Sequence, residues 1–205
     1  MSKPRKIGWY LLGMVAICAL AVGQEGAAQS YRSTLRKPTV EVFQSMLRAT
    51  TQQDYDGLKK SLTLLDPILV EVNRKFQVDL AAEFLKAISE GRHAAVAATV
   101  RKLIFYDMKD LFALLTQERG LTEAQMQAFL KSAYLDYQLL APTVTAQSVE
   151  TNARIQRWFK EAAEEFSIDP SPFSREKGVD RQRVQRTTQR IEAACAAALP
   201  GLSHP

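Results

Sequence analysis

The residue that most suggests chemistry is Asp107, an acidic residue in the helix-periodic segment 101–115. Successive residues of an α-helix rotate by about 100°. This rotation places Asp107 inside the apolar stripe that contains Val100, Ile104 and Leu111. A buried carboxylate is costly unless it is paired, hydrogen-bonded or protonated. The helical phase therefore predicts that Asp107 is buried and has a polar partner.

Two tyrosines and an asparagine could supply that partner. Tyr134 and Tyr137 lie on the apolar side of a later predicted helix, and Asn152 lies on the apolar side of the next one. Together with Asp107 they could form a polar pocket for a cation or a small polar ligand, and His93 could join it or lie in solvent. The alternative is a tyrosine–aspartate hydrogen bond that fixes helix packing. We favour this alternative because buried polar groups usually have structural partners.

Sequence motifs of the common catalytic sites are missing. The chain has no glycine-rich phosphate loop, no Gly-x-Ser-x-Gly motif, no Cys-x-x-Cys-His haem site and no Glu-x-x-His pair. His93 and His204 are the two histidines, which gives little support for zinc chemistry or a Ser-His-Asp triad. Which cofactor or metal, if any, the protein binds stays unknown, and an enzyme is the less favoured interpretation.

The N-terminus has the pattern of a secretory signal peptide at residues 1–28. Basic residues precede an uncharged, mostly apolar run at 8–22, and small residues allow cleavage after Ala28. The pattern predicts a periplasmic or secreted protein that is not stably inserted in a membrane. The alternative is an uncleaved signal that anchors the chain in the inner membrane. Residues 29–38 are predicted to be a polar lead into the folded domain.

Charge and cysteine content narrow the possible partners. Cleavage after Ala28 removes three of the 27 Lys and Arg residues and one of the 22 Asp and Glu residues, which leaves 24 minus 21, or +3. This mild charge, without a dense basic patch, argues against binding nucleic acid. Cys195 would be the single remaining cysteine, so the mature chain could form no internal disulfide.

The remaining sequence predicts an all-α antiparallel bundle of about six or seven helices over residues 39–200, followed by a tail at 201–205. Apolar residues recur with helical spacing, and Thr122 with Gln125 forms a predicted capping box. The expected helices lie near residues 40–47, 58–65, 66–91, 92–118, 122–140, 145–166 and 180–198, with Pro142 breaking or bending the chain and 167–178 forming a loop.

Two helical hairpins resemble each other at a constant offset of 38 residues. Met46, Leu58 and Leu62, for example, match Phe84, Val96 and Val100. The pattern is explained equally well by a duplicated helix–turn–helix unit and by chance agreement between two amphipathic patterns.

Arginines on the last predicted helix suggest an interaction surface. A separate chain could dock on the small-residue stripe of this helix, but we favour the alternative that the helix covers its own bundle. Arg183, Arg186 and Arg190 would then form a solvated face that could recognise acidic groups of a partner. The missing catalytic motifs and the many amphipathic helices favour an exported accessory protein that binds another exported or membrane-associated protein and has no catalytic activity. The alternative is a bundle that binds a small ligand or a metal around Asp107.

Overall fold

The computed structural model describes residues 39–117, 120–166 and 179–202. The chain divides into the units Met1–Thr39 and Val40–Pro205. The predicted signal peptide, the polar lead and the 167–178 loop lie outside the described residues. From Val40 onward, the described residues all belong to the second unit.

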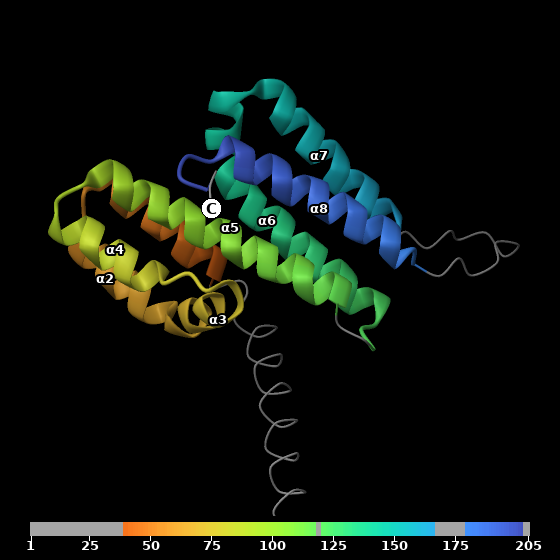
Figure 1. Cartoon of the computed structure of the whole chain (residues 1–205), viewed down its shortest axis with the longest axis horizontal. Helices are drawn as coiled ribbons and strands as arrows, with labels where there is room; N and C mark the ends of the chain where they lie inside the picture. Colours follow the sequence, from red (N-terminus) through yellow and green to blue (C-terminus); the bar gives the residue numbers. More distant parts are fainter. Residues whose placement is uncertain (1–38, 118–119, 167–178, 203–205) are drawn as a thin grey trace, which may run out of the picture. The chain divides into compact units, whose positions relative to one another are not determined.

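The predicted all-α bundle is confirmed, and no strand occurs in the described residues. A helical stretch at 39–52 is followed by seven helices with short connections (Figure 1). Consecutive long helices fold back on one another, as the prediction of an antiparallel bundle requires. Their bounds are α2 Tyr55–Leu64, α3 Asp66–Phe76, α4 Leu80–Ser89, α5 His93–Gln117, α6 Glu123–Gln147, α7 Val149–Glu164 and α8 Arg181–Ala198.

Helix α5 is the centre of the bundle. It packs against α3, α4, α6 and α8, so side chains on several of its faces are buried. Among the three helices that follow α5, α7 packs on both α6 and α8, and α6 also contacts α8. Over the described ranges, none of the helices combines the length and the apolar character needed to cross a bilayer.

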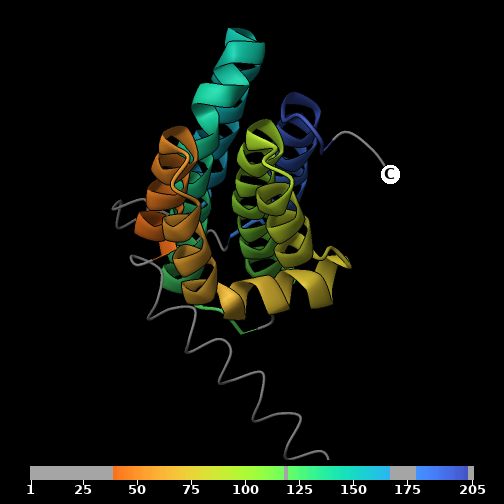
Figure 2. The ribbon, with the colours of Figure 1, turned by 90° about the vertical axis from the view of Figure 1, so that its left-hand side faces the viewer.

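The prediction of a single helix over 66–91 is wrong, because the chain turns between α3 and α4. Gln77 ends α3 in the left-handed conformation at φ 55°, and Asp79 caps α4 by accepting a hydrogen bond of 3.0 Å from the Ala82 backbone N–H. No glycine or proline marks this turn. The reversal allows both helices to pack on α5, and α3 (yellow) lies crosswise at one end of its neighbours (Figure 2).

Pro142 was predicted to break or bend the chain, and the break is wrong, since α6 continues through Pro142 to Gln147. Proline removes one N–H donor and leaves the carbonyl of residue 138 without its helical partner. Residues 138 and 142 are both exposed, so water can bind that carbonyl. The helix ends where Ser148 caps α7 with its side chain. The capping box of Thr122 and Gln125 at the start of α6 is confirmed.

Two turns that are 38 residues apart have the same backbone conformation and the same hydrogen bonds. Gln53 and Gly91 occupy equivalent positions, and both are left-handed, at φ 58° and φ 64°. The four backbone hydrogen bonds around Gln53 recur around Gly91 with the same offset. The equivalent residues Tyr55 and His93 meet, with parallel rings whose centroids are 5.6 Å apart. These features support the duplicated-hairpin interpretation over chance agreement.

Candidate functional site

Asp107 is buried as predicted, with 4% of its surface exposed. The predicted hydrogen bond to a tyrosine is not present: within the described part of the chain, Asp107 bonds neither Tyr134 nor Tyr137. Helical periodicity therefore correctly predicted that the Asp107 side chain is buried. It could not specify which side chain of another helix would meet it.

Tyr137 and Asn152, two other predicted site residues, do come together. The buried Tyr137 hydroxyl of α6 donates a hydrogen bond to Asn152 Oδ1 of α7. Burial raises the pKa of Tyr137 above its usual value, so the phenol stays protonated and remains a donor. The bond links two helices that also share apolar contacts. Its geometry fits a structural role in helix packing.

His93 lies in solvent at the start of α5, as the sequence suggested. Its Nδ1 is hydrogen-bonded to the Tyr55 hydroxyl of α2, which lies in the other hairpin of the repeat. The five predicted ligand-binding residues therefore do not gather into a single pocket. Only Tyr137 and Asn152 are joined by a hydrogen bond.

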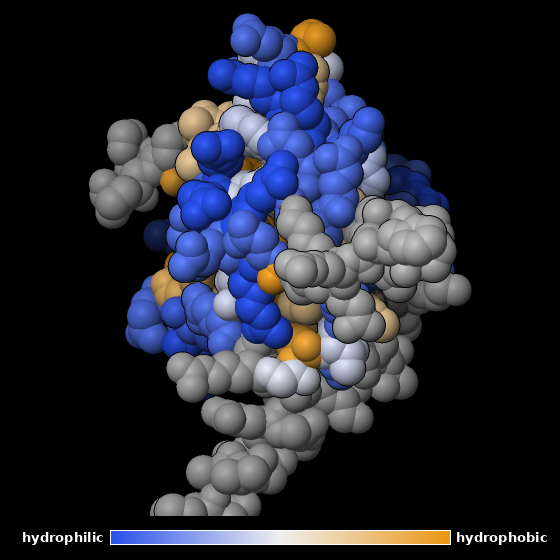
Figure 3. All heavy atoms as spheres, turned by 90° about the vertical axis from the view of Figure 1, so that its right-hand side faces the viewer, coloured by the Kyte–Doolittle hydropathy of each residue, from blue (hydrophilic) through white to orange (hydrophobic). Residues whose placement is uncertain are grey.

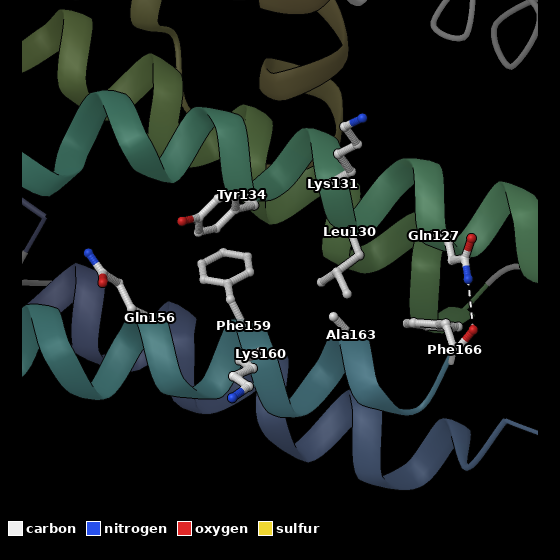
Figure 4. Close-up of a pocket in the computed structure, with 9 residues that line it drawn as sticks. All are labelled: Gln127, Leu130, Lys131, Tyr134, Gln156, Phe159, Lys160, Ala163 and Phe166. Carbon is white, nitrogen blue, oxygen red and sulfur yellow. Dashed lines mark hydrogen bonds between the residues drawn. The ribbon is translucent and has the colours of Figure 1, made fainter. Parts of the chain in front are cut away.

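Tyr134 instead lines a groove between α6 and α7, which we term the α6–α7 groove. Its volume is about 430 Å³, it is partly open to solvent, and its lining side chains come from α6, α7 and the residue Phe166 that follows α7 (Figure 4). Nine residues line it: Gln127, Leu130, Lys131, Tyr134, Gln156, Phe159, Lys160, Ala163 and Phe166.

Aromatic contacts hold the middle of the groove. Phe159 of α7 is 4% exposed and contacts three rings. Its ring centroid lies 5.2 Å from that of Tyr134, 5.4 Å from that of Tyr137 and 5.8 Å from that of Phe112. Aromatic pairs at these separations add to the stabilisation that comes from area burial. The groove thus has a floor anchored to α5, α6 and α7, while the Tyr134 ring remains 38% exposed at the surface.

The ends and edges of the groove are polar. At one end, Gln127 Nε2 donates a hydrogen bond of 2.7 Å to the Phe166 carbonyl oxygen, which ties α6 to the end of α7 (Figure 4). Lys131 and Lys160 extend away from the gap on opposite sides, one from each helix. None of the nine lining residues is acidic. An apolar floor between two cations suits a partner that carries apolar and acidic groups together.

Exposed apolar surface is otherwise limited. The face in Figure 3 is mostly hydrophilic, with small hydrophobic areas between polar residues. In the described ranges the large exposed apolar side chains are scattered, and Tyr134 and Leu135 are neighbours in sequence on α6. Successive residues of a helix point about 100° apart, so these two side chains do not form one continuous apolar patch.

The predicted partner-binding arginines share a second cavity, between α7 and α8. Arg183, Arg186 and Arg190 line a space of about 340 Å³ together with Glu161 of α7 and Thr187 of α8. Their spacing of three and four residues puts them on one face of α8. Helical spacing identified these arginines, whereas the acidic residue opposite them could not be predicted.

Two titratable side chains lie close together on α8, the buried Cys195 and the half-buried Glu192. Burial, together with the nearby Glu192 carboxylate, raises the pKa of the Cys195 thiol to about 12. Burial also raises the pKa of Glu192 to about 7, partly opposed by the Lys109 ammonium group. A buried, protonated thiol is a poor nucleophile, so this cysteine has the character of a packing residue.

Metal binding finds no support in the part of the chain that the structure describes. There, no group of three or more His, Cys, Asp and Glu side chains is arranged to hold an ion. Comparisons with family models, curated proteins and solved structures found no match for the chain. The α6–α7 groove and the cavity between α7 and α8 are two features of the described residues that could bind a ligand or a partner.

Proposed function

We propose that this protein is an exported accessory protein without catalytic activity, and that it binds an amphipathic, acidic helix of another exported or membrane-associated protein. The proposed binding site is the α6–α7 groove. Export is supported by the signal-peptide pattern of residues 1–28, which favours a periplasmic location. The observation that carries the proposal is the apolar groove with a lysine on each side.

The shape of the groove favours a helix over an enclosed small molecule. Sites for small molecules usually bury most of the ligand surface, whereas the α6–α7 groove is partly open to solvent. An amphipathic helix needs only a groove that accepts the side chains of one of its faces. Phe159 and Leu130 supply a rigid floor for such side chains, and Tyr134 is the kind of exposed aromatic residue that often dominates binding energy.

The charges beside the groove favour an acidic partner over a basic one. Lys131 and Lys160 flank the groove, and no carboxylate lines it. A basic helix would meet two like charges, whereas Asp or Glu residues beside the apolar face would meet opposite ones. These lysines would contribute mainly to the association rate and to partner choice, because exposed ion pairs add little affinity.

A ligand pocket around Asp107 is the less favoured function. It requires Asp107, Tyr134, Tyr137 and Asn152 to share one space. Tyr134 lines the groove, whereas the Tyr137 hydroxyl bonds to Asn152. No observation favours this alternative over the groove.

Site-specific photocrosslinking in the native compartment tests the proposal. A photoreactive amino acid at exposed Ala163, inside the groove, is expected to crosslink a partner protein, whereas one at exposed Ala153, outside the groove on the same helix, is not. Sequencing of the adduct should identify a segment with an apolar helical face and flanking acidic residues. Three results would overturn the proposal: no adduct from position 163, a crosslinked segment that is basic, or an adduct within this chain or a second copy of it.

A further inference from the structure

The cavity between α7 and α8, which we term the arginine cavity, is lined by three cations and one anion. Arg183, Arg186 and Arg190 come from α8, and Glu161 comes from α7. Thr187, the fifth lining residue, is 5% exposed. The cavity holds about 340 Å³, enough for a small ligand or for one group of a larger one.

The three arginines differ in whether they form an ion pair. Arg183 Nη1 lies 2.5 Å from Glu165 Oε1, and the Glu165 side chain is only 6% exposed. This pair links α7 to α8 and neutralises Arg183. Among the described residues, Arg186 and Arg190 form no ion pair. The two positive charges of Arg186 and Arg190 and the negative charge of Glu161 leave the cavity with a net charge of +1.

The hydroxyl of Thr187 is a further polar group of the cavity. Many helix hydroxyls of the described residues donate to a backbone carbonyl within the same helix, as Thr145 does to Ala141 at 2.7 Å and Thr188 does to Gln185 at 3.0 Å. Thr187 makes no such bond with any described residue, although it is nearly buried. Its hydroxyl is therefore available as a donor beside Arg183 and Arg190, which lie one turn away on either side.

We propose that the arginine cavity binds a phosphate group, with Arg186 and Arg190 contacting its oxygens and Thr187 donating a hydrogen bond. The planar guanidinium group can offer two parallel N–H donors to a phosphate, which favours arginine for this role. Glu161 opposes a bare anion by charge repulsion. It favours a ligand whose phosphate is accompanied by a hydroxyl or amino group, because Glu161 can accept a hydrogen bond from that group.

This site is independent of the α6–α7 groove. The groove uses Phe159 and Ala163 of α7, whereas the arginine cavity uses Glu161 of the same helix and residues of α8. Failure of helix binding in the groove would leave phosphate binding intact, and the reverse also holds. The proposal therefore goes beyond the proposed function.

Titration calorimetry of the mature protein with inorganic phosphate at low ionic strength and neutral pH tests the site. Saturable binding is expected. Arg190→Gln should weaken it about tenfold, the lower end of the loss expected for one hydrogen bond to a charged group. Glu161→Gln should strengthen binding because it removes a repulsive charge. Arg157→Gln, which removes an exposed charge of α7 outside the cavity, is the matched control and should have no effect.

Sedimentation with vesicles distinguishes the two sources of phosphate. Binding to vesicles of anionic phospholipid that Arg190→Gln abolishes would assign the site to a lipid headgroup, whereas phosphate binding without vesicle binding would assign it to a free ligand. The proposal is overturned if neither probe binds. It is also overturned if Arg157→Gln weakens binding as much as Arg190→Gln, because the attraction would then belong to the whole surface.

Discussion

Replacing Glu192 by glutamine is predicted to stabilise the protein near pH 8 and to change its stability little near pH 4. Burial raises the pKa of Glu192 from 4.5 to about 7 in the folded protein, with partial opposition from Lys109. At a pH between these two values, the Glu192 carboxyl group is mostly ionised in the unfolded chain and mostly protonated in the folded protein. The contribution of Glu192 to stability is therefore fully present below about pH 4.5 and is lost as pH rises to about 7 and above.

The size of the effect follows from the pKa change. One pKa unit corresponds to 1.36 kcal/mol, so the change from 4.5 to about 7 gives an upper value of about 3 kcal/mol. The carboxylate is only half-buried, and its contact with water lowers this value to about 1 to 2 kcal/mol. Glutamine keeps the shape of the side chain and cannot ionise, so the variant should gain this amount at high pH alone.

Urea unfolding followed by far-ultraviolet circular dichroism measures the difference at both pH values. Glu164→Gln is the control, because Glu164 is an exposed acid near the end of α7 and should give no pH-dependent difference. Comparing variants at each pH cancels the titration of all other groups. If Glu192→Gln differed from the wild type by the same free energy of unfolding near pH 4 and near pH 8, the raised pKa of Glu192 in the folded protein would be refuted.

Three further outcomes are expected. Tyr137→Phe should cost about 1 kcal/mol of unfolding free energy by removing its bond to Asn152, and Asn152→Ala should then add less than it costs in the wild type; additive costs would contradict the coupling. Cys195 should react with a thiol reagent only as fast as the protein opens, because it is buried and its pKa is about 12; rapid labelling of native protein would show otherwise. Asp107→Asn should alter stability by about 1 kcal/mol and leave binding in the groove unchanged, and loss of that binding would restore the ligand-pocket interpretation.

Most of the fold could be predicted from helical periodicity and capping signals. Thr122 with Gln125 marked the start of α6, and Gly91 marked the turn before α5. The errors arose where tertiary packing replaced a local signal. Gln77 adopts a left-handed conformation although it is not glycine. Pro142 is tolerated within α6 because the backbone carbonyl of residue 138, which loses its helical hydrogen bond, belongs to an exposed residue and can bind water.

The candidate site was less predictable because it depends on pairs of helices. Periodicity identified the apolar faces of α6 and α7 and the buried position of Asp107, but not which residues of the two helices face each other. Phe159 was an apolar residue in the sequence, and only the packing of α7 on α6 makes it the floor of a groove beside Tyr134. Arg186 and Arg190 were identifiable from their spacing, whereas their proximity to Glu161 depends on α7.

The most direct test of partner binding in the α6–α7 groove is a calorimetric titration with a synthetic peptide of the crosslinked partner segment and a second peptide in which its acidic residues are replaced by lysine. Wild-type protein is predicted to bind the acidic peptide more tightly. A variant with Lys131→Glu and Lys160→Glu is predicted to prefer the basic one, because the two flanking charges are reversed while the apolar floor is kept. Equal affinity of both proteins for both peptides, or an unchanged preference in the variant, would contradict the claim that an acidic helix binds in this groove.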